Sequence, residues 1–444
     1  MAPAADQLLY AYYGDDFTGS TDVLESLAQA GVASVLFLRM PTAQALERFR
    51  HCRAIGIAGQ SRSQSPAWMQ ANLPDILQAL RALHPAVVHY KVCSTFDSSP
   101  THGSIGCALE IGQTIFQQRC TLVVPAAPHL GRYVLFGKLY ATAGDALYRI
   151  DLHPTMSRHP VTPMLEPDLC KHLARQTALP LRLLDVLALR DKHPAEALAG
   201  CDLEEACAIV LDGVDDATSR ATSRLLMAMS GPEPCFVVGS SGVTEALVAM
   251  WREQGWLPPV AATARQATAA EPLLVVSGSC SPVTERQIVW ARANGFVPVA
   301  AEGARLCDPA SCDAESARLE LLARPALQRG ASVVLYTALG PLQPGAAPAP
   351  HRLGQALGRV THRLLQQCGG LTRVVLCGGD TASHAVPQLP VSALQWLAPL
   401  APGAPLCRAY GEDGFRDVEL VLKGGQIGAE DFFALARAGG AASG

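Results

Sequence analysis

The sequence predicts an α/β fold with two domains, each built on a mainly parallel sheet flanked by helices. The first observation is that short apolar runs alternate with longer amphipathic stretches, a pattern typical of β-α-β units. The second is that this alternation stops in residues 259–272 and then restarts. The third is the composition. Of the 444 residues, 49% are hydrophobic and only 17% are charged, which favours large buried cores over disorder.

In the first domain, short apolar runs predict buried strands and amphipathic stretches predict helices. The predicted strands are Leu8–Tyr13, Val32–Leu38, Ala54–Ala58, Ala86–Lys91, Leu122–Pro125, Ala208–Asp212 and Cys235–Gly239. The predicted helices are Ser20–Ala30, Trp68–Leu83, Gly103–Gln117 and Val243–Gln254. Because strands and helices alternate, we expect the strands to run mainly parallel.

Residues 259–272 predict a linker, because they are small, rich in alanine and bounded by prolines. We therefore expect a first domain over 1–258 and a second, smaller domain over 273–444. The second domain has one clear predicted helix, Ser281–Asn294. Its predicted strands are Leu273–Ser277, Phe296–Ala300, Ser332–Tyr336 and Val374–Cys377.

Composition and charge exclude several function classes. The formal net charge of −4 argues against a nucleic-acid-binding protein, which usually carries a basic face. No uninterrupted apolar stretch reaches the length of about 18 residues that a membrane span needs, and the N-terminus lacks the basic start of a signal peptide. The 14 cysteines form no C-x-x-C pair, so we expect reduced thiols in a cytoplasmic protein. A homodimer is expected from the general frequency of two-fold dimers.

The first polar motif is Y-G-D-D-F-T-G-S-T-D, residues 13–22, which follows the first predicted strand. Ligands of parallel sheets bind at the carboxyl ends of the strands, where Asp15 and Asp16 lie and Thr18 supplies a hydroxyl. The motif therefore predicts a polar substrate site with a carboxylate acting as general base or hydroxyl clamp. The alternative is that Asp16 or Thr18 only caps the helix. Two adjacent carboxylates are more than a cap needs.

A second motif, residues 90–106, also follows a predicted strand. It places a cation, hydroxyls and a carboxylate in one loop, which suits an anionic, polyhydroxylated ligand. The alternative is an ordinary Ser/Pro turn. The candidate ligand-binding residues in this loop are Lys91, Ser94, Thr95 and Asp97.

Three further segments contain weaker candidates. Gly131 to Lys138 is not a phosphate-binding Walker loop, because five residues separate its glycines and Leu139 stands where Ser or Thr must bind magnesium. Arg132 remains a candidate for binding a carboxylate, and Arg158 belongs to another polar cluster. The turn V-V-G-S-S-G after the strand at 235–239 could bind an anion or a substrate carboxylate, or could be a close-packed turn only. Its candidates are Ser240 and Ser241.

In the second domain, two strands end in Gly/Ser loops that open helices, residues 275–284 and 374–383. Side by side, such loops cradle phosphates with backbone N–H groups. The terminal L-K-G-G-Q-I-G, residues 422–428, strengthens this prediction. Asp380 could hold magnesium, directly or through water. The candidate phosphate-binding residues are Ser277, Ser279, Gly378, Gly379, Asp380, Thr381 and Gly425.

Four motifs together resemble the four-carbon acid sugar kinases, a family long labelled a domain of unknown function. They are D-D-F-T-G at 15–19, S-G-S-C-S at 277–281, G-G-D-T at 378–381 and K-G-G-Q-I-G-x-x-D-F-F at 423–433. The resemblance implies an N-terminal domain that binds an acid sugar and a C-terminal domain that binds ATP. It places acid-sugar contacts on Asp15, Asp16, Lys91, Ser94 and Thr95. It places nucleotide contacts on Ser279, Gly378, Gly379, Asp380, Thr381 and Gly425.

This reading predicts an ATP- and magnesium-dependent kinase that phosphorylates a hydroxyl of threonate, erythronate, 3-oxo-tetronate or a related acid. Asp16 is the expected group that orients or deprotonates the hydroxyl, with Asp15 or Asp97 as the alternative. Lys91 and Arg132 are expected to hold the substrate carboxylate. A non-catalytic acid-sugar binding protein and a nucleotide-dependent ligase are the other candidates.

The chain departs from the commoner family pattern K-x-D-S-T-x-R-G in its second motif. Cys93 replaces the Asp and Asp97 replaces the Arg, so at position 97 the loop has lost a cation and gained an anion. Arginine is a natural partner for a carboxylate or a phosphate. The departure therefore favours a branched or oxidised acid, such as 3-oxo-isoapionate, over a linear threonate.

Overall fold

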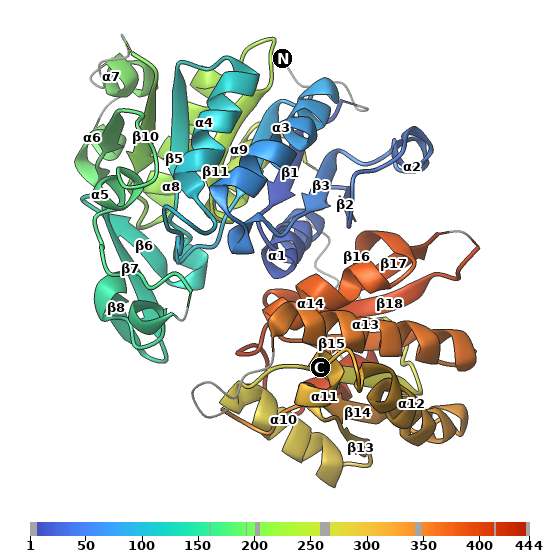
Figure 1. Ribbon diagram of the computed structural model, residues 1–444. Coiled ribbons are helices and arrows are strands. Elements are labelled where there is room, and N and C mark those ends of the chain that lie inside the picture. The colour runs from blue at the N-terminus through green and yellow to red at the C-terminus, as the bar shows by residue number, and fades with distance from the viewer. Residues whose placement is uncertain are drawn as a thin grey trace. The chain divides into compact units, whose positions relative to one another are not determined.

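The computed structural model describes residues 7–159, 161–191, 193–199, 205–257, 267–341, 349–412 and 414–440. The chain divides into two compact units (Figure 1). Unit 1 contains Met1–Ser34 and Thr42–Val260, and unit 2 contains Val35–Pro41 and Ala261–Gly444. Much of the expected linker, residues 259–266, lies outside the described residues.

Unit 1 is built on a parallel sheet with the strand order β3-β1-β4-β11-β5-β10-β9. The parallel sheet expected for the first domain is therefore confirmed. The strands are β1 Tyr10–Gly14, β3 Ala54–Ala58, β4 Val87–Lys91, β5 Cys120–Val124, β9 Leu181–Leu184, β10 Cys207–Leu211 and β11 Cys235–Gly239.

Helices cover both faces of this sheet, with α3 packed beside α4 on one face and α8 beside α9 on the other (Figure 1). All but β9 of its strands are wholly buried, which explains their nearly continuous apolar sequences. The longer helices of unit 1 are α1 Phe17–Gln29, α3 Pro66–Ala82, α4 Ile105–Phe116, α8 Asp216–Met229 and α9 Gly242–Glu253. The shorter ones are α2 Ala43–Arg48, α5 Leu169–Leu173, α6 Val186–Asp191 and α7 Pro194–Ala199.

A separate antiparallel sheet lies between β5 and β10 in the chain. Its strands are β6 Arg132–Leu135, β7 Lys138–Ala143 and β8 Ala146–Arg149, in the order β6-β7-β8. These strands are only partly buried, so they lack the apolar runs that revealed the main sheet. This sheet was not predicted.

Unit 2 has a parallel sheet in the order β13-β14-β12-β15-β18, extended by the antiparallel strands β17 and β16. Leu36 and Phe37 of β2 (Ser34–Phe37) pair antiparallel with Leu394 and Ala393 at the end of this extension. An early segment thus completes the later unit, which no local pattern could reveal. The strands are β12 Leu273–Ser277, β13 Val297–Ala300, β14 Val333–Tyr336, β15 Arg373–Cys377, β16 Val391–Ala401, β17 Ala404–Gly411 and β18 Val418–Lys423.

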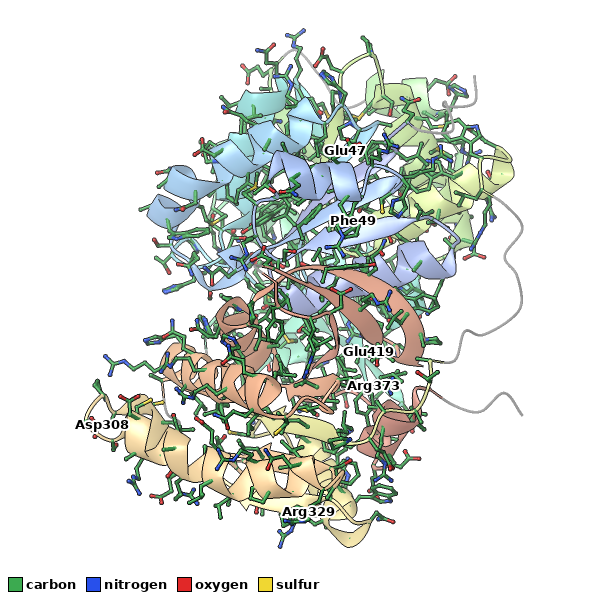
Figure 2. The ribbon with its side chains drawn as sticks, turned by 90° about the vertical axis from the view of Figure 1, so that its right-hand side faces the viewer. Glu47, Phe49, Asp308, Arg329, Arg373 and Glu419 are labelled. Carbon is green, nitrogen blue, oxygen red and sulfur yellow. The ribbon has the colours of Figure 1, made fainter. Side chains whose placement is uncertain are left out.

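The helices of unit 2 pack around this sheet. They are α10 Pro282–Ala293, α11 Gly303–Cys307, α12 Cys312–Gln328, α13 Pro350–Gln367, α14 Gly379–Ala385 and α15 Phe432–Ala438. A buried arginine ties three segments of the unit together. The Nε and Nη2 of Arg373 donate to Glu419 on β18 (2.7 and 2.6 Å), and other N–H groups donate to the backbone oxygens of Ala436 and Thr268 (Figure 2). A buried charge is tolerated because every partner is supplied.

No helix within the described ranges is both long and apolar enough to cross a bilayer. The 13 cysteines that the structure describes all have free thiols, as expected from their spacing.

Candidate active site

The first cluster of predicted residues lies where β1 and β4 are neighbours in the sheet of unit 1. After β1 the chain continues to β3, which lies on the side of β1 away from β4. After β4 it continues to β5, which lies on the side of β4 away from β1. The two connections therefore run in opposite directions from the boundary between β1 and β4. Such a switch point leaves a crevice at the carboxyl ends of the strands. Gly14 is paired with Lys91, so Asp15 and Asp16 emerge beside the Lys91 side chain.

Arg62, which the sequence analysis did not single out, donates hydrogen bonds to both predicted carboxylates, Asp15 and Asp16. Its Nε and Nη2 donate to the two oxygens of Asp15 (3.0 and 2.6 Å), and its Nη1 donates to Asp16 Oδ2 (2.8 Å). Arg62 lies in the 3₁₀ turn Ser61–Ser63 after β3. This turn reaches the site because β3 is the other neighbour of β1, and the backbone N–H of Arg62 donates to the carbonyl of Asp15 (3.1 Å).

Asp16 is both a helix cap and a member of this charged cluster. Its Oδ1 accepts the N–H of Gly19 (2.7 Å), so α1 begins at Phe17, earlier than the predicted Ser20. The two readings of Asp16 that the sequence left open are therefore compatible. Its side chain is 19% exposed, against 7% for Asp15, so Asp16 is the more accessible carboxylate.

Burial dominates the electrostatics of the cluster. It raises the pKa of Asp15 to about 6, although Arg62 opposes this increase. Burial also acts to lower the pKa of Arg62. The charges of Asp15 and Asp16, with smaller effects of Cys93 and Asp97, nevertheless hold it well above its ordinary value. The guanidinium is therefore permanently charged and lies within electrostatic reach of the second predicted motif.

Lys91 brings a second cation to the same place. A Cβ atom on Gly19 would lie 3.1 Å from Lys91 Nζ and 2.6 Å from Asp16 Oδ1, so glycine allows α1 to begin against this cluster. The Lys91 side chain is buried, with 3% of the residue exposed. In the part of the chain that the structure describes, its ammonium group has no hydrogen-bond or ion-pair partner. A buried cation without a partner is available for an anionic ligand.

The loop after β4 adds a carboxylate and hydroxyls. The hydroxyl of Thr95 lies 2.5 Å from Asp97 Oδ1 and 3.0 Å from Cys93 Sγ. Asp97 is 7% exposed, and its other oxygen has no hydrogen bond to any described residue. Ser94 lies half-buried in the same loop. Asp97 can therefore accept a hydrogen bond from a ligand hydroxyl while Thr95 holds its first oxygen.

The two predicted serines after β11 lie beside β4, because Gly239 pairs with Lys91. The Ser240 hydroxyl donates to the backbone oxygen of Ala126 (3.0 Å), so its contact is structural. The hydroxyl of Ser241 is buried without a partner among the described residues, as is that of Thr18. These two hydroxyls remain available to a ligand.

The predicted arginines Arg132 and Arg158 lie elsewhere in unit 1. Arg132 begins β6, and its Nη1 donates to the backbone oxygen of Leu130 (2.6 Å) and to Thr142 Oγ1 (3.1 Å). These contacts hold the hairpin of the small antiparallel sheet. Arg158 is exposed at the end of the 3₁₀ turn Met156–Arg158. The structure gives neither arginine a hydrogen bond or ion pair with the cluster around Arg62.

In unit 2, the predicted phosphate-binding residues meet at the ends of the neighbouring strands β12, β15 and β18. A Cβ on Gly278 would lie 2.4 Å from Thr381 Oγ1, and a Cβ on Gly425 would lie 2.7 Å from Ser279 Oγ. Gly378 has a φ of 109°, which strongly favours glycine. At these glycines the backbone of one loop lies directly against a hydroxyl side chain of the next loop, which leaves backbone N–H groups near one another, as a phosphate cradle requires.

Serine side chains hold the first of these loops in shape. Ser277 Oγ accepts from the N–H of Ser279 (3.3 Å), and Ser279 Oγ accepts from the N–H of Ser281 (3.2 Å). Ser281 then caps α10 by accepting from Val283 (3.1 Å). The positive end of the α10 dipole thus lies beside the cradle and favours a negative charge there.

Lys423 is a second residue that the sequence analysis missed. It is fully buried, and its Nζ donates to the backbone oxygen of Gly424 (2.9 Å) and to Thr284 Oγ1 (3.3 Å). Thr284 donates in turn to the backbone oxygen of Gly425 (2.8 Å). Burial lowers the pKa of Lys423, and Cys377 opposes this effect. Lys423 therefore fixes the backbone of the third loop.

A magnesium site would depend on Asp380 alone. No group of three or more His, Cys, Asp or Glu side chains suited to a metal occurs within the described ranges. Asp380 is exposed in the first turn of α14, directly after the Gly378–Gly379 loop. Magnesium on nucleotides is usually held by one or two carboxylates together with phosphate oxygens and water. The residues present therefore fit a magnesium ion that arrives with a nucleotide.

Two family models match the chain in the order of its two units. A model described as a sugar-binding N-terminal domain matches residues 10–247. A model described as a nucleotide-binding C-terminal domain matches residues 274–433. The first match includes the charged cluster at the ends of β1 and β4, formed by Asp15, Asp16, Arg62, Lys91 and Asp97 (the β1/β4 cluster). The second includes the three loops that follow β12, β15 and β18 (the three-loop cradle).

Relatives with assigned names cover almost the whole chain. A protein of Paraburkholderia graminis named 3-oxo-isoapionate kinase is 45% identical over 97% of this chain and 94% of its own length. Proteins of Cupriavidus necator and Pseudomonas fluorescens named 3-oxo-tetronate kinases are each 30% identical, over 98% and 95% of this chain and the same shares of their own lengths.

Solved structures support the fold. A crystal structure from Salmonella typhimurium LT2, provisionally titled a tRNA synthase, has a TM-score of 0.74 at 24% identity and covers 96% of this chain and 98% of its own. A Haemophilus influenzae protein from a family of unknown function has a TM-score of 0.70 at 23% identity and covers 96% and 99%. With the family models and the named relatives, the conclusion is plain: this chain belongs to the four-carbon acid sugar kinase family.

Proposed function

We propose that this acid sugar kinase transfers the terminal phosphoryl group of ATP to a hydroxyl of 3-oxo-isoapionate or a closely related branched 3-oxo acid. The observation that carries the proposal is the 45% identity along nearly the whole chain to a relative named for that substrate. The relatives named for 3-oxo-tetronate are about one third less similar, at 30% identity.

The β1/β4 cluster supplies the groups that such a substrate needs. Lys91 has an ammonium group without a hydrogen-bond or ion-pair partner among the described residues, and Arg62 has guanidinium N–H groups beyond the three that donate to Asp15 and Asp16. Both cations can therefore hold the substrate carboxylate. Asp97 can accept a hydroxyl of the branch with its free oxygen, which supports a branched acid over a linear one.

Asp16 is the residue we assign to the attacking hydroxyl. It is the more exposed of the two carboxylates, and Arg62 and the Gly19 N–H fix its orientation. A fixed carboxylate within hydrogen-bond reach can orient the hydroxyl and accept its proton. Asp15 acts through Arg62, because both of its oxygens accept from that guanidinium.

The cradle of unit 2 is the proposed ATP site. The backbone of Gly278, Gly378 and Gly425 leaves room where a side chain would collide, and Ser279 and Thr381 line the same space. Asp380 would hold magnesium, directly or through water. Bound magnesium neutralises charge on the β- and γ-phosphates.

The test is to incubate the enzyme with ATP and magnesium and a panel of four-carbon and branched five-carbon acids, including 3-oxo-isoapionate and 3-oxo-tetronate. We expect ADP release and a product heavier by one phosphoryl group. Release of AMP would favour a ligase. Binding of acids without turnover, in a protein that binds no ATP, would favour a binding protein.

Two further expectations accompany this proposal. A two-fold homodimer is proposed from the frequency of such dimers among enzymes, and sedimentation analysis tests it. Action in the cytoplasm is proposed because the free thiols suit a reducing compartment.

A further inference from the structure

The loop after β4 contains a strained residue directly before Asp97. Phe96 has a φ of 57°, in the left-handed region that bulky side chains rarely adopt. Its ring is fully buried in the core of unit 1. A strained backbone of this kind persists only where the surrounding structure enforces it. The contacts that hold Phe96 therefore also decide where the neighbouring carboxylate of Asp97 lies.

Ser98, on the other side of Asp97, is buried and anchored by residues from another part of the chain. Its hydroxyl donates to the backbone oxygen of Phe96 (3.1 Å), which closes the segment on itself. The same hydroxyl accepts from Gln176 Nε2 (2.9 Å) and lies 2.9 Å from His172 Nε2. His172 belongs to α5, and Gln176 follows shortly after this helix. We call Ser98, His172 and Gln176 the α5 clamp.

The hydrogen-bond roles within the α5 clamp follow from its surroundings. Gln176 Oε1 accepts from the N–H of Ile105 at the start of α4 (2.9 Å), so the amide nitrogen faces the clamp and can only donate. That nitrogen lies 3.0 Å from His172 Nε2. Burial lowers the pKa of His172 to about 4, so its ring is neutral near pH 7 and can accept this hydrogen bond. The clamp is therefore a satisfied polar network, which rigidifies the residues that it joins.

His172 holds the strained segment through its ring as well. The centroids of the His172 and Phe96 rings are 6.3 Å apart, and the ring planes make an angle of 59°. Asp97 thus lies between a residue that packs on α5 and a residue that is hydrogen-bonded to the clamp. The Thr95 hydroxyl fixes one carboxylate oxygen of Asp97 at 2.5 Å. The direction of the second carboxylate oxygen therefore depends on the α5 clamp.

We infer that the three residues of the α5 clamp are positioning residues that set the selectivity of the enzyme, because they aim the second oxygen of Asp97 at the substrate. The inference rests on the proposed function, which assigns that oxygen to a hydroxyl of the branch. The clamp acts through Asp97 and does not itself contact the substrate. Without the clamp, Phe96 can relax out of the left-handed region, and Asp97 moves with it.

The test compares kcat/KM for 3-oxo-isoapionate with kcat/KM for 3-oxo-tetronate in variants of the clamp. In Ser98→Ala and in Gln176→Leu, this ratio should fall by about fivefold, since a misplaced carboxylate keeps only part of a hydrogen bond. The fall should come from the branched acid, with kcat/KM for 3-oxo-tetronate changed less than about twofold. The double variant should lose little more than the larger single loss, because both substitutions remove the same contact.

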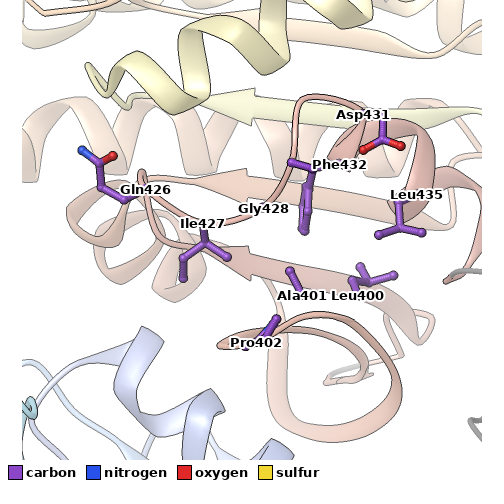
Figure 3. A pocket seen from close by; sticks show the side chains of 10 residues that line it. Leu400, Ala401, Pro402, Gln426, Ile427, Gly428, Asp431, Phe432 and Leu435 are labelled. Atoms are coloured by element: carbon purple, nitrogen blue, oxygen red, sulfur yellow. The ribbon is translucent and has the colours of Figure 1, made fainter. Parts of the chain in front are cut away.

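Two Gln→Leu exchanges outside the clamp are the matched controls. Gln113 on α4 is buried and donates to the backbone oxygen of Cys207 (2.5 Å), so Gln113→Leu removes a buried hydrogen bond in the same unit. Gln426 lines a cavity of unit 2 together with Ile427 (Figure 3), so Gln426→Leu makes the same exchange in the other unit. Neither control should change the ratio. Asp97→Ala is the reference variant and should abolish the preference for the branched acid.

An unchanged ratio in the folded clamp variants, with the preference lost in Asp97→Ala, would overturn the inference and leave the proposed function intact. Equal losses for the two acids would also overturn it, because the clamp would then serve stability alone. If Gln176→Leu fails to fold, Ser98→Ala decides, since it removes a single hydroxyl. A preference that survives in Asp97→Ala would instead remove the role proposed for Asp97, and the inference with it.

Discussion

The β1/β4 cluster of unit 1 and the three-loop cradle of unit 2 occupy the same place in their sheets, the carboxyl ends of parallel strands, but they are built differently. The cluster consists of side chains: Asp15, Asp16 and Asp97 lie around Arg62, with Lys91 beside them. The cradle consists of backbone held by serines and one buried lysine. A side-chain site can select among similar acids, whereas a backbone site binds phosphates that all nucleotides share.

The largest expected effect comes from removing a charge in the side-chain site. In Asp16→Asn, kcat should fall by about 10²-fold or more, because general-base catalysis typically contributes about 10² to 10⁴. KM for ATP should change little, since the variant leaves unit 2 intact. Steady-state kinetics measure both constants. Asp22→Asn on the same helix is the matched control, and a near-normal kcat in Asp16→Asn would refute the assignment.

In the three-loop cradle, the affinity for ATP should be more sensitive to an added carbon atom at a glycine than to the loss of a polar side chain. Gly425→Ala places a Cβ 2.7 Å from Ser279 Oγ and 3.1 Å from Ser281 Cβ, so either the Ser279 hydroxyl must leave its hydrogen bond to the Ser281 N–H or the loops must move apart. We expect KM for ATP to rise about tenfold with no change in KM for the acid sugar. Gly370→Ala, where a Cβ meets nothing within 4 Å, is the control. If both variants behave alike, the cradle does not depend on close backbone approach.

The charge balance of the cluster predicts a pH effect that the cradle lacks. Because burial raises the pKa of Asp15 to about 6, this carboxyl takes up a proton as the pH falls through that value. The protonated acid no longer balances Arg62, so kcat/KM for the acid sugar should fall below about pH 6. In Asp15→Asn the activity should be lower but this pH dependence should disappear. A profile of the variant that keeps the same acid limb would assign the limb to another group.

A further expected effect concerns stability in unit 1. Burial lowers the pKa of His89 to about 3 and that of His172 to about 4. The unfolded chain protonates these histidines near pH 6.5, so stability should fall as the pH decreases from about 6.5 toward 4. Each histidine contributes at most about 1.4 kcal/mol per pH unit. Thermal midpoints at pH 7, 6 and 5 should fall less steeply in His172→Gln, and identical slopes would contradict this account.

Most of the strands that the sequence revealed are buried on both faces. The strands at 54–58 and 235–239 have their predicted bounds, because continuous apolar runs mark central parallel strands. The antiparallel strands β6 to β8 and the pairing of Phe37 with β16 were missed, and the strands β9, β16, β17 and β18 were not predicted either. The strands β6 to β8 are half-exposed, and the pairing of Phe37 joins residues far apart in the chain.

In the β1/β4 cluster, too, residues that follow an apolar strand were predicted, whereas residues brought in by the pairing of distant strands were missed. The sequence predicted that Asp15, Asp16 and Lys91 lie together, because polar residues directly after neighbouring parallel strands lie at the same edge of a sheet. Arg62 was missed because it lies in a polar turn, and only the pairing of β1 with β3 brings it to the carboxylates. Lys423 was missed because a lysine at a strand end does not indicate complete burial.

The most direct measurement is the ratio of kcat/KM for 3-oxo-isoapionate to that for 3-oxo-tetronate, with ATP saturating. If side chains such as Asp97 select the substrate, the branched acid should be preferred by about tenfold or more, since one extra buried hydrogen bond is worth roughly 1 to 2 kcal/mol. Equal efficiencies, or a preference for 3-oxo-tetronate, would contradict the account of the β1/β4 cluster as a site for branched acids.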